Sequence, residues 1–208
     1  TAESPDDVRR AEAALMAASA GHLPLHVLIE SPAAVHRAFE IAAHPKVQSL
    51  SFGLMDFVSA HGGAIPADAM SSSGQFTHPL VVRAKLEIAA ACHAHGKVPS
   101  HGVVTEFTDG AALQAAATRA ARELGYTRMW SIHPAQIRPI LAAFAPNERE
   151  IERASSIIEA AVHAEWAPIQ YDNQLHDRAS YRYFWQVIER AHQTGRPLPD
   201  TIRPFFSH

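Results

Sequence analysis

Two acidic residues, Glu30 and Asp56, are the first candidates for chemistry in this sequence, because each follows a short run of strand-forming residues. The runs are LHVLI at 25–29 and VQSLSFG at 47–53, and the apolar residues between them recur with helical spacing. A helix that connects two strands makes them parallel, so both carboxylates are expected at the same edge of a sheet.

The chemistry that suits such a pair is the binding of a metal ion. Two carboxylates with no cation between them repel each other, whereas a hard divalent cation such as Mg2+ binds one or two of them and fills its shell with water and substrate oxygens. Glu30 and Asp56 are therefore candidate metal ligands. The alternative is structural, because an acid after a strand often caps the helix that follows. Spacing by itself leaves both interpretations open.

The elements that must position these acids alternate between strand and helix through the first two thirds of the chain. This alternation is typical of an α/β fold with a parallel sheet, and a doubly wound sheet and a (β/α)8 barrel both fit. No glycine-rich phosphate-binding motif follows a strand, which disfavours the nucleotide-binding version. The barrel gains support because polar residues stand at each strand's carboxyl end, where barrel enzymes keep their chemistry: Glu30, Asp56, the pair Ser100 and His101, and His133.

Start signals and periodicity predict the individual elements. A helix begins at Pro5 behind a Ser4 cap, a single helix covers residues 33–42, and a later helix has Asp109 or Thr108 as its cap. The run from Tyr126 predicts a strand through about Ile132, with His133 and Pro134 closing the turn into the next helix. The Pro-, Gly- and Ser-rich stretch that follows Asp56 is expected to lie over the site.

Composition sets the broad class. The chain has 208 residues, 47% of them hydrophobic and 19% charged, with a net charge of −3 and no block of one sign. This pattern is typical of a globular protein, and it contains no cluster of basic residues of the kind that binds nucleic acids. No apolar run approaches the roughly 18 residues of a membrane span. The only cysteine, Cys92, is predicted to be a small buried hydrophobe, and the lack of a disulfide framework fits a cytoplasmic protein.

The last third of the chain differs from the rest. An amphipathic helix is predicted behind Asn147, followed by a short extended segment with an Asp-Asn turn and a final helix rich in aromatic residues. Such an aromatic helix must cover something, either its own domain or a neighbouring subunit.

Five segments in order carry a resemblance to a known family: LIESPAAV, FGLMDF, PLVVRAKLEIAAACHAHG, SIHPAQIRPILAAFAPNEREIERA and YDNQLHDRASY. Together they resemble the citrate lyase β-subunit-like and malyl-CoA lyase family, which are Mg2+-dependent carbon–carbon lyases on a (β/α)8 barrel. The resemblance implies that residues 1–145 are the C-terminal part of such a barrel and that residues 146–208 are a helical extension that contacts a neighbouring subunit of a homo-oligomer, a trimer or hexamer. The first residues resemble the end of one strand and the cap of a helix.

The resemblance also assigns roles to residues. Glu30 and Asp56 match the family's metal-ligating acids, for Mg2+ with Mn2+ as an alternative. Asp177, in QLHDRAS, matches an aspartate that reaches a neighbouring subunit's site and is implicated in proton transfer, although His176 and Arg178 replace apolar or small residues there. The backbone amides of Leu54, Met55 and Asp56 are then expected to help bind the anionic substrate, as a helix N-terminus does. The implied substrate is a hydroxyacyl-CoA such as malyl-, citramalyl- or citryl-CoA, or an oxo-acid.

At several positions this sequence differs from the family's pattern, and these differences keep other functions open. Ser100 and His101 stand where the family has a segment with an acid; His101 is interpreted first as a histidine hydrogen-bonded to a backbone carbonyl, and otherwise as an acid/base or substrate contact. The loop at 71–75 lacks basic residues for the phosphates of CoA, and the family's substrate-binding arginine would lie upstream of Thr1. The alternatives are a metal-dependent oxo-acid aldolase that does not use CoA and a non-catalytic family member with a binding or assembly role. An Asp177 that only caps the last helix also remains open.

Overall fold

The structure, a computed structural model, describes residues 1–105 and 109–206 and divides into two compact units. The first unit comprises residues 1–143, and the second begins at Phe144. The division falls beside the connection between two helices, α7 (Ile137–Phe144) and α8 (Glu148–His163). Among the described residues, no helix has both the length and the apolar character that are needed to cross a bilayer.

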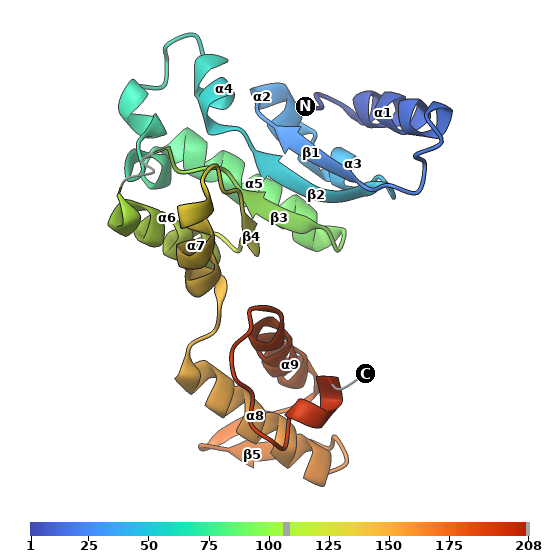
Figure 1. Ribbon diagram of the computed structural model, residues 1–208, viewed down its shortest axis with the longest axis vertical. Coiled ribbons are helices and arrows are strands. Elements are labelled where there is room, and N and C mark those ends of the chain that lie inside the picture. Colours follow the sequence, from blue (N-terminus) through green and yellow to red (C-terminus); the bar gives the residue numbers. More distant parts are fainter. Residues whose placement is uncertain (106–108, 207–208) are drawn as a thin grey trace. The chain divides into compact units, whose positions relative to one another are not determined.

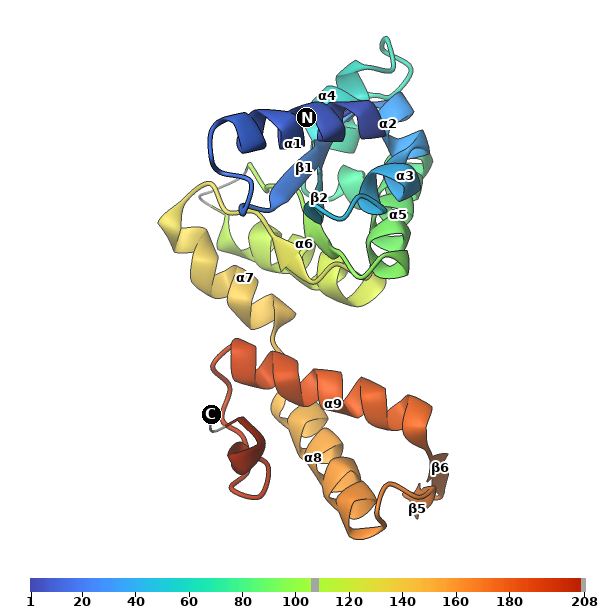
Figure 2. The same ribbon diagram turned by 90° about the vertical axis from the view of Figure 1, so that its right-hand side faces the viewer.

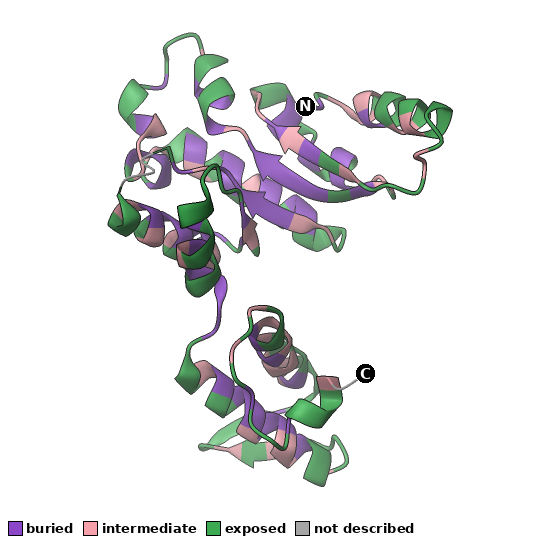
Figure 3. Cartoon of the chain, in the orientation of Figure 1, coloured by how far each residue is buried: buried purple, intermediate pink, exposed green. Residues whose placement is uncertain are grey.

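The first unit is built on a four-stranded sheet in which every neighbouring pair of strands is parallel (Figure 1). Their order is β1-β2-β3-β4, which follows the chain, so the predicted parallel α/β arrangement is confirmed. The strands are β1 (Leu25–Ile29), β2 (Val47–Phe52), β3 (Val98–His101) and β4 (Arg128–Met129). Burial is most continuous along β2 and β3, which have a neighbouring strand on both sides (Figure 3).

The last strand is shorter than the sequence predicts. β4 ends at Met129, and only the amide of Trp130 continues the pairing, with a hydrogen bond of 3.1 Å to the carbonyl of His101. The amide of Ile132 donates instead to the Gln136 side chain, at 2.9 Å. The backbone amide of Ile132 is therefore not paired in the sheet, and the predicted strand through Ile132 is wrong in its second half.

Helices connect the strands, and their caps agree with the start signals. Ser4 and Asp7 form a capping box at the first helix, and Asp109 accepts hydrogen bonds from two amides of α6. Thr108, the alternative cap for α6, lies outside the described residues. The helices of this unit besides α7 are α1 (Pro5–Ala17), α2 (Pro32–His36), α3 (Ala38–Ala42), α4 (Leu54–Ser59), α5 (Pro79–Ala94) and α6 (Gly110–Glu123), with 3-10 helices η1 (Ala67–Met70), η2 (Gly74–Phe76) and η3 (Pro134–Gln136).

The single helix predicted between β1 and β2 is divided in two. Arg37 ends α2 with φ −100° and ψ 11°, and α3 begins at the next residue. The change of direction still leaves Val35 and Ile41 buried, since α2 and α3 both pack against α5.

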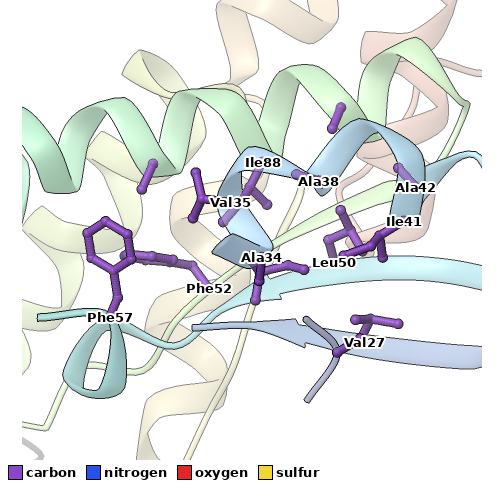
Figure 4. Close-up of a cluster of buried hydrophobic side chains, with 14 of the residues drawn as sticks. Val27, Ala34, Val35, Ala38, Ile41, Ala42, Leu50, Phe52, Phe57 and Ile88 are labelled. Carbon is purple, nitrogen blue, oxygen red and sulfur yellow. The ribbon is translucent and has the colours of Figure 1, made fainter. Parts of the chain in front are cut away.

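The helices α3 and α5 cover one face of the sheet, in both views of the unit (Figures 1 and 2). Figure 4 shows Val27, Leu50 and Phe52 reaching from the strands toward this layer, where they meet Val35 and Ile88. Because successive strand residues point to opposite faces, His26, Leu28 and Glu30 belong to the other face. That assignment agrees with the hydrogen bond of 2.7 Å between His26 Nδ1 and Ser49 Oγ on the neighbouring strand.

The second unit contains two helices joined by a β-hairpin. Asp172 and Asn173 both have positive φ, 48° and 58°, which is the backbone of a tight hairpin turn and confirms the predicted Asp-Asn turn. The elements are α8, β5 (Ile169–Tyr171), β6 (Gln174–His176), α9 (Arg178–Gln193) and the 3-10 helix η4 (Arg203–Phe206).

Candidate active site

Glu30 and the segment that carries Asp56 lie at the carboxyl edge of the sheet. Ile29 pairs with Phe52 in parallel register, and the amide of Gly53 donates to the carbonyl of Ile29 at 2.9 Å. Glu30 and Gly53 therefore leave the sheet as neighbours, and Asp56 follows in the first turn of α4. The parallel order that the sequence predicts thus brings both acids to one edge.

Gly53 is required by the position of the Glu30 side chain. A Cβ atom at Gly53 would lie 2.6 Å from Glu30 Cβ and 2.6 Å from Glu30 Oε2, closer than real Cβ contacts come. The missing side chain leaves a space into which the Glu30 carboxylate fits against the backbone of the next strand. The sequence shows the glycine but not this contact, which depends on the register of β1 and β2.

Neither Glu30 nor Asp56 is the N-cap of a helix. The alternative interpretation, in which each acid caps the helix that follows it, is therefore wrong. Ser31 is the N-cap of α2 and accepts from the amide of Ala34 at 3.0 Å, while Gly53 is the N-cap of α4. Within the part of the chain that the structure describes, Glu30 accepts a hydrogen bond only from the Thr1 hydroxyl, and Asp56 forms no side-chain hydrogen bond or ion pair.

The start of α4 adds three backbone donors beside the acids. The amides of Leu54, Met55 and Asp56 stand in the first turn, where no preceding helical carbonyl is in reach. The N-cap residue Gly53 has no side chain that could accept a hydrogen bond from these amides. Across residues 1–105 and 109–206, no group accepts a hydrogen bond from any of the three. Asp56 and three free amides, which suit a hard cation and an anion respectively, therefore share the start of α4, and Glu30 lies against Gly53 directly before it.

His101 belongs to the opposite face of the sheet from Glu30. Its ring is fully buried, stacks on Phe76 with 5.4 Å between ring centroids, and lies 2.9 Å from Lys85 Nζ through Nε2. Nδ1 lies 3.0 Å from the carbonyl of Gly102, so Nδ1 carries the hydrogen and Nε2 accepts from Lys85. This confirms the interpretation of His101 as a histidine hydrogen-bonded to a backbone carbonyl and does not support an acid/base role.

Lys85 is not among the candidate residues that the sequence predicts. Its ammonium donates to Gln75 Oε1 at 2.7 Å and lies 4.0 Å from the centre of the Phe76 ring, so it fixes the end of the loop that follows α4. Burial lowers the pKa of Lys85 well below 10.5, and Arg119 lowers it further. A signal was present, because Lys85 stands at helical spacing in the apolar stripe of α5 with Val81, Ile88 and Cys92.

The buried imidazole makes stability depend on pH. Burial, and secondarily the charge of Lys85, lowers the pKa of His101 well below 6.5 in the folded protein. As the pH falls below about 6.5, His101 is therefore protonated in the unfolded chain while it stays neutral in the folded protein. The unfolded state therefore binds more protons below that pH, and the free energy of unfolding should fall as the pH is lowered, by up to about 1.4 kcal/mol per pH unit from this group.

Urea unfolding at several pH values between about 7 and 5 checks this expectation. His101→Gln should flatten the dependence on pH, whereas the same change at the exposed His95 should leave the slope as it is. If the free energy of unfolding has the same slope against pH in His101→Gln as in the unmodified protein, the buried histidine is not the cause of the pH dependence.

The other candidate residues, Cys92, His133 and Ser100, have contacts that are typical of residues with a structural role. Cys92 is buried, and burial raises the pKa of its thiol to about 11, as expected of a small core residue. His133 is the N-cap of η3 and accepts from the amide of Ala135 at 3.2 Å, which confirms its role in the turn. Ser100 is buried on the same face as Ser51, and its Oγ has no partner among the described residues.

Asp177 lies in the second unit as the N-cap of α9. Its Oδ1 accepts from the amides of Ala179 and Ser180 at 3.0 and 3.4 Å, so the predicted capping role is present. Oδ2 forms no hydrogen bond with any described residue, and the side chain is exposed. Capping therefore leaves one oxygen for another task, and the proton-transfer role stays a prediction.

Comparison with known proteins defines the family. A model of the HpcH/HpaI aldolase/citrate lyase family matches residues 1–134. The chain belongs to this family. It is 31% identical over 181 residues to the L-malyl-CoA/beta-methylmalyl-CoA lyase of Rhodobacter capsulatus, covering 81% of this chain and 57% of that protein.

Solved structures agree with this aldolase/citrate lyase assignment. A citrate lyase from Burkholderia xenovorans LB400 is similar over 100% of this chain and 66% of its own, with a TM-score of 0.85 and 53% identity. The protein CitE of Mycobacterium tuberculosis, solved with magnesium and pyruvate, is 26% identical over 60% of this chain and 50% of its own, with a TM-score of 0.51. The chain thus spans little more than half of the curated lyase and just under two thirds of the Burkholderia chain.

Proposed function

We propose that this protein is a Mg2+-dependent carbon–carbon lyase that cleaves or forms a bond in a hydroxyacyl-CoA of the malyl-, citramalyl- or citryl-CoA kind. The observation that carries the proposal is the juxtaposition at the carboxyl edge of the sheet: Glu30 against Gly53, with Asp56 and the free amides of α4 directly after it. The relative from Rhodobacter capsulatus is named for the cleavage of malyl-CoA, which supports the substrate class.

The donor set fits a hard divalent ion. Glu30 and Asp56 offer oxygen ligands, neither is neutralised by an ion pair with a described residue, and two carboxylates suffice for Mg2+ when water and substrate complete its shell. Mn2+ would fit the same ligands. The ion, when bound, would stabilise the negative charge that develops on a substrate oxygen as the carbon–carbon bond breaks.

The residues of the chain then have separate tasks. Glu30 and Asp56 would hold the ion, and the amides of Leu54, Met55 and Asp56 would orient the anionic end of the substrate. Asp177 would move the proton that balances the cleavage, from the subunit that neighbours the site in a homo-oligomer, a trimer or hexamer. Its unoccupied Oδ2 is the atom suited to that transfer.

We further propose that the four strands form the C-terminal half of a (β/α)8 barrel, with residues 146–208 as an extension that contacts a neighbouring subunit. In support, the amide of Ala2 donates to the carbonyl of Leu28 at 3.3 Å, so the residues before α1 run along the outer edge of β1 as another strand would.

Magnesium titration tests the proposal. The protein should bind Mg2+ in calorimetry, and a chelator should abolish the cleavage of malyl-CoA until Mg2+ is restored. Gly53→Ala should weaken Mg2+ binding by about tenfold or more, because its Cβ displaces the Glu30 carboxylate.

Gly110→Ala is the matched control, since a Cβ there meets nothing within 4 Å. The lyase proposal is wrong if chelation leaves the cleavage rate unchanged. A CoA-independent aldolase would instead cleave free oxo-acids with the same metal requirement, and a non-catalytic member would bind Mg2+ without turnover.

A further inference from the structure

The second unit has a groove of about 490 Å³ along α8. The chain that follows α9 folds back beside α8 (Figures 1 and 2), and the Thr201 hydroxyl donates to Glu159 Oε1. Three glutamates, two serines and Ile151 of α8 line one side of the groove, and residues 197–199 line the other. Its volume is within the usual range for small-molecule sites, roughly 300–1,000 Å³, so the groove is large enough to hold a ligand.

The groove is acidic, and none of the described residues that line it is basic. Glu148 and Glu152 form no hydrogen bond or ion pair with a described residue. Glu159 accepts from Thr201 through Oε1, and its Oε2 has no partner in the part of the chain that the structure describes. A cleft lined by charges of one sign concentrates ions of the opposite sign, so this groove favours a cation.

The carboxylates are spread along the helix rather than gathered around one point. Across residues 1–105 and 109–206, no three acidic or other metal-binding side chains are close enough together to hold a metal ion. Glu152, Ser155 and Glu159 lie on one face of α8, with about 4.5 Å along the axis from 152 to 155 and about 6 Å from 155 to 159. The charges therefore suit an elongated cation with a positive group at each end.

Ser155 lies between the two carboxylates in the lining of the groove. It is only 2% exposed, and its Oγ has no hydrogen-bond partner among the described residues. Buried hydroxyls without a partner are rare, because the desolvation of the oxygen is not repaid. A ligand with a hydrogen-bond donor in its middle would supply the missing partner.

The wall opposite α8 is apolar and held in place. Pro197 and Pro199 have φ fixed by their rings, and the buried Leu198 belongs to the same hydrophobic cluster as Ile151. The amide of Ile202 donates to the carbonyl of Pro199 at 3.0 Å. An aliphatic chain could therefore contact residues 197–199 without having to order them.

We propose that this groove binds a linear polyamine with three ammonium groups. The terminal groups would pair with Glu152 and Glu159, and the central one would donate to Ser155 Oγ. Chains of three and four methylene groups, as in spermidine, match the two axial separations and would lie against residues 197–199. Glu148 adds negative charge at one end of the groove. The site belongs to the second unit alone and does not depend on the proposed lyase function.

Calorimetric titration of the full protein without Mg2+, in about 0.15 M salt to screen weak surface contacts, tests this assignment. The probes are spermidine, 1,8-diaminooctane, in which a methylene replaces the central amine, and putrescine, which is too short to reach both carboxylates. Spermidine should bind saturably, 1,8-diaminooctane about tenfold more weakly, and putrescine more weakly still. No saturable binding of spermidine, or equal affinities for spermidine and 1,8-diaminooctane, overturns the assignment.

Variants of the carboxylates locate the site. Glu152→Gln/Glu159→Gln should raise the Kd for spermidine by about tenfold or more, because two charge-assisted contacts are lost. Glu165→Gln/Asp172→Asn is the charge-matched control, since both residues are exposed acids of the same unit that do not line the groove. The control should keep the Kd of the unmodified protein. Equal Kd values for the two double variants contradict the assignment.

Ser155→Ala tests the central contact. It should weaken the binding of spermidine and leave that of 1,8-diaminooctane unchanged, because only spermidine has a donor at this point. Equal losses for the two probes would refute a hydrogen bond to Ser155.

Glu30→Gln separates this proposal from the lyase proposal. It should keep the affinity for spermidine, since Glu30 does not line the groove, and should lose Mg2+ binding. Loss of spermidine binding in Glu30→Gln would place the polyamine at the acids of the first unit and would refute the groove.

Discussion

Replacing Glu30 with Gln or Asp56 with Asn should lower lyase activity by about 1,000-fold or more and should weaken Mg2+ binding in parallel. Each change keeps the size of the side chain and removes the charge that binds the cation, and charge stabilisation by a metal ion is worth several kcal/mol in the transition state. The stability of the fold should change little, because Glu30 is only half-buried and Asp56 is exposed. Cleavage of malyl-CoA, Mg2+ calorimetry and urea unfolding measure the three quantities.

Asp68→Asn is the matched control for these variants. Asp68 is an exposed acid in η1, on the loop that follows α4, and only its backbone carbonyl forms hydrogen bonds with Ser71. It should retain activity and Mg2+ affinity. If both site variants bind Mg2+ as well as the control does, Glu30 and Asp56 are not the ligands.

Replacing Lys85 with Ala should lower the free energy of unfolding by about 3–5 kcal/mol. The change leaves a cavity in a fully buried position, and it removes the partner of Gln75 Oε1 and His101 Nε2. The loss should reach beyond α5, because the Lys85 ammonium also lies against the Phe76 ring at the end of the loop. Urea unfolding measures the effect.

Lys97→Ala gives the comparison, because Lys97 is a half-buried lysine that follows the same helix. Its loss should cost no more than about 0.5 kcal/mol. Lys85→Met, which fills most of the volume, should be less destabilising than Lys85→Ala, and the difference between them reports the packing contribution. Equal stabilities for Lys85→Ala and Lys97→Ala would show that the buried lysine is not part of the support for the loop.

Elements with local causes could be predicted from the order of the amino acids. The Ser4 and Asp109 caps, the Asp172–Asn173 turn and the strand–helix alternation all follow from the preferences of a few adjacent residues, and the structure has each of them. The parallel order, and hence the shared edge for Glu30 and Asp56, follows from the alternation because a crossover helix leaves no other arrangement. The family followed from five segments in order, each too short to identify it alone.

The contacts of each candidate side chain, and the face of the sheet on which it lies, could not be predicted in this way because they depend on long-range packing. The sequence put His101 beside Glu30 at the strand ends, but strand alternation assigns His101 to the helix-covered face, where it binds Lys85. The contact between Gly53 and Glu30 and the burial of Lys85 depend on register and packing between segments that are separated in the chain. Local preferences carry no information about such distances, because they are set by how whole elements fill space against one another.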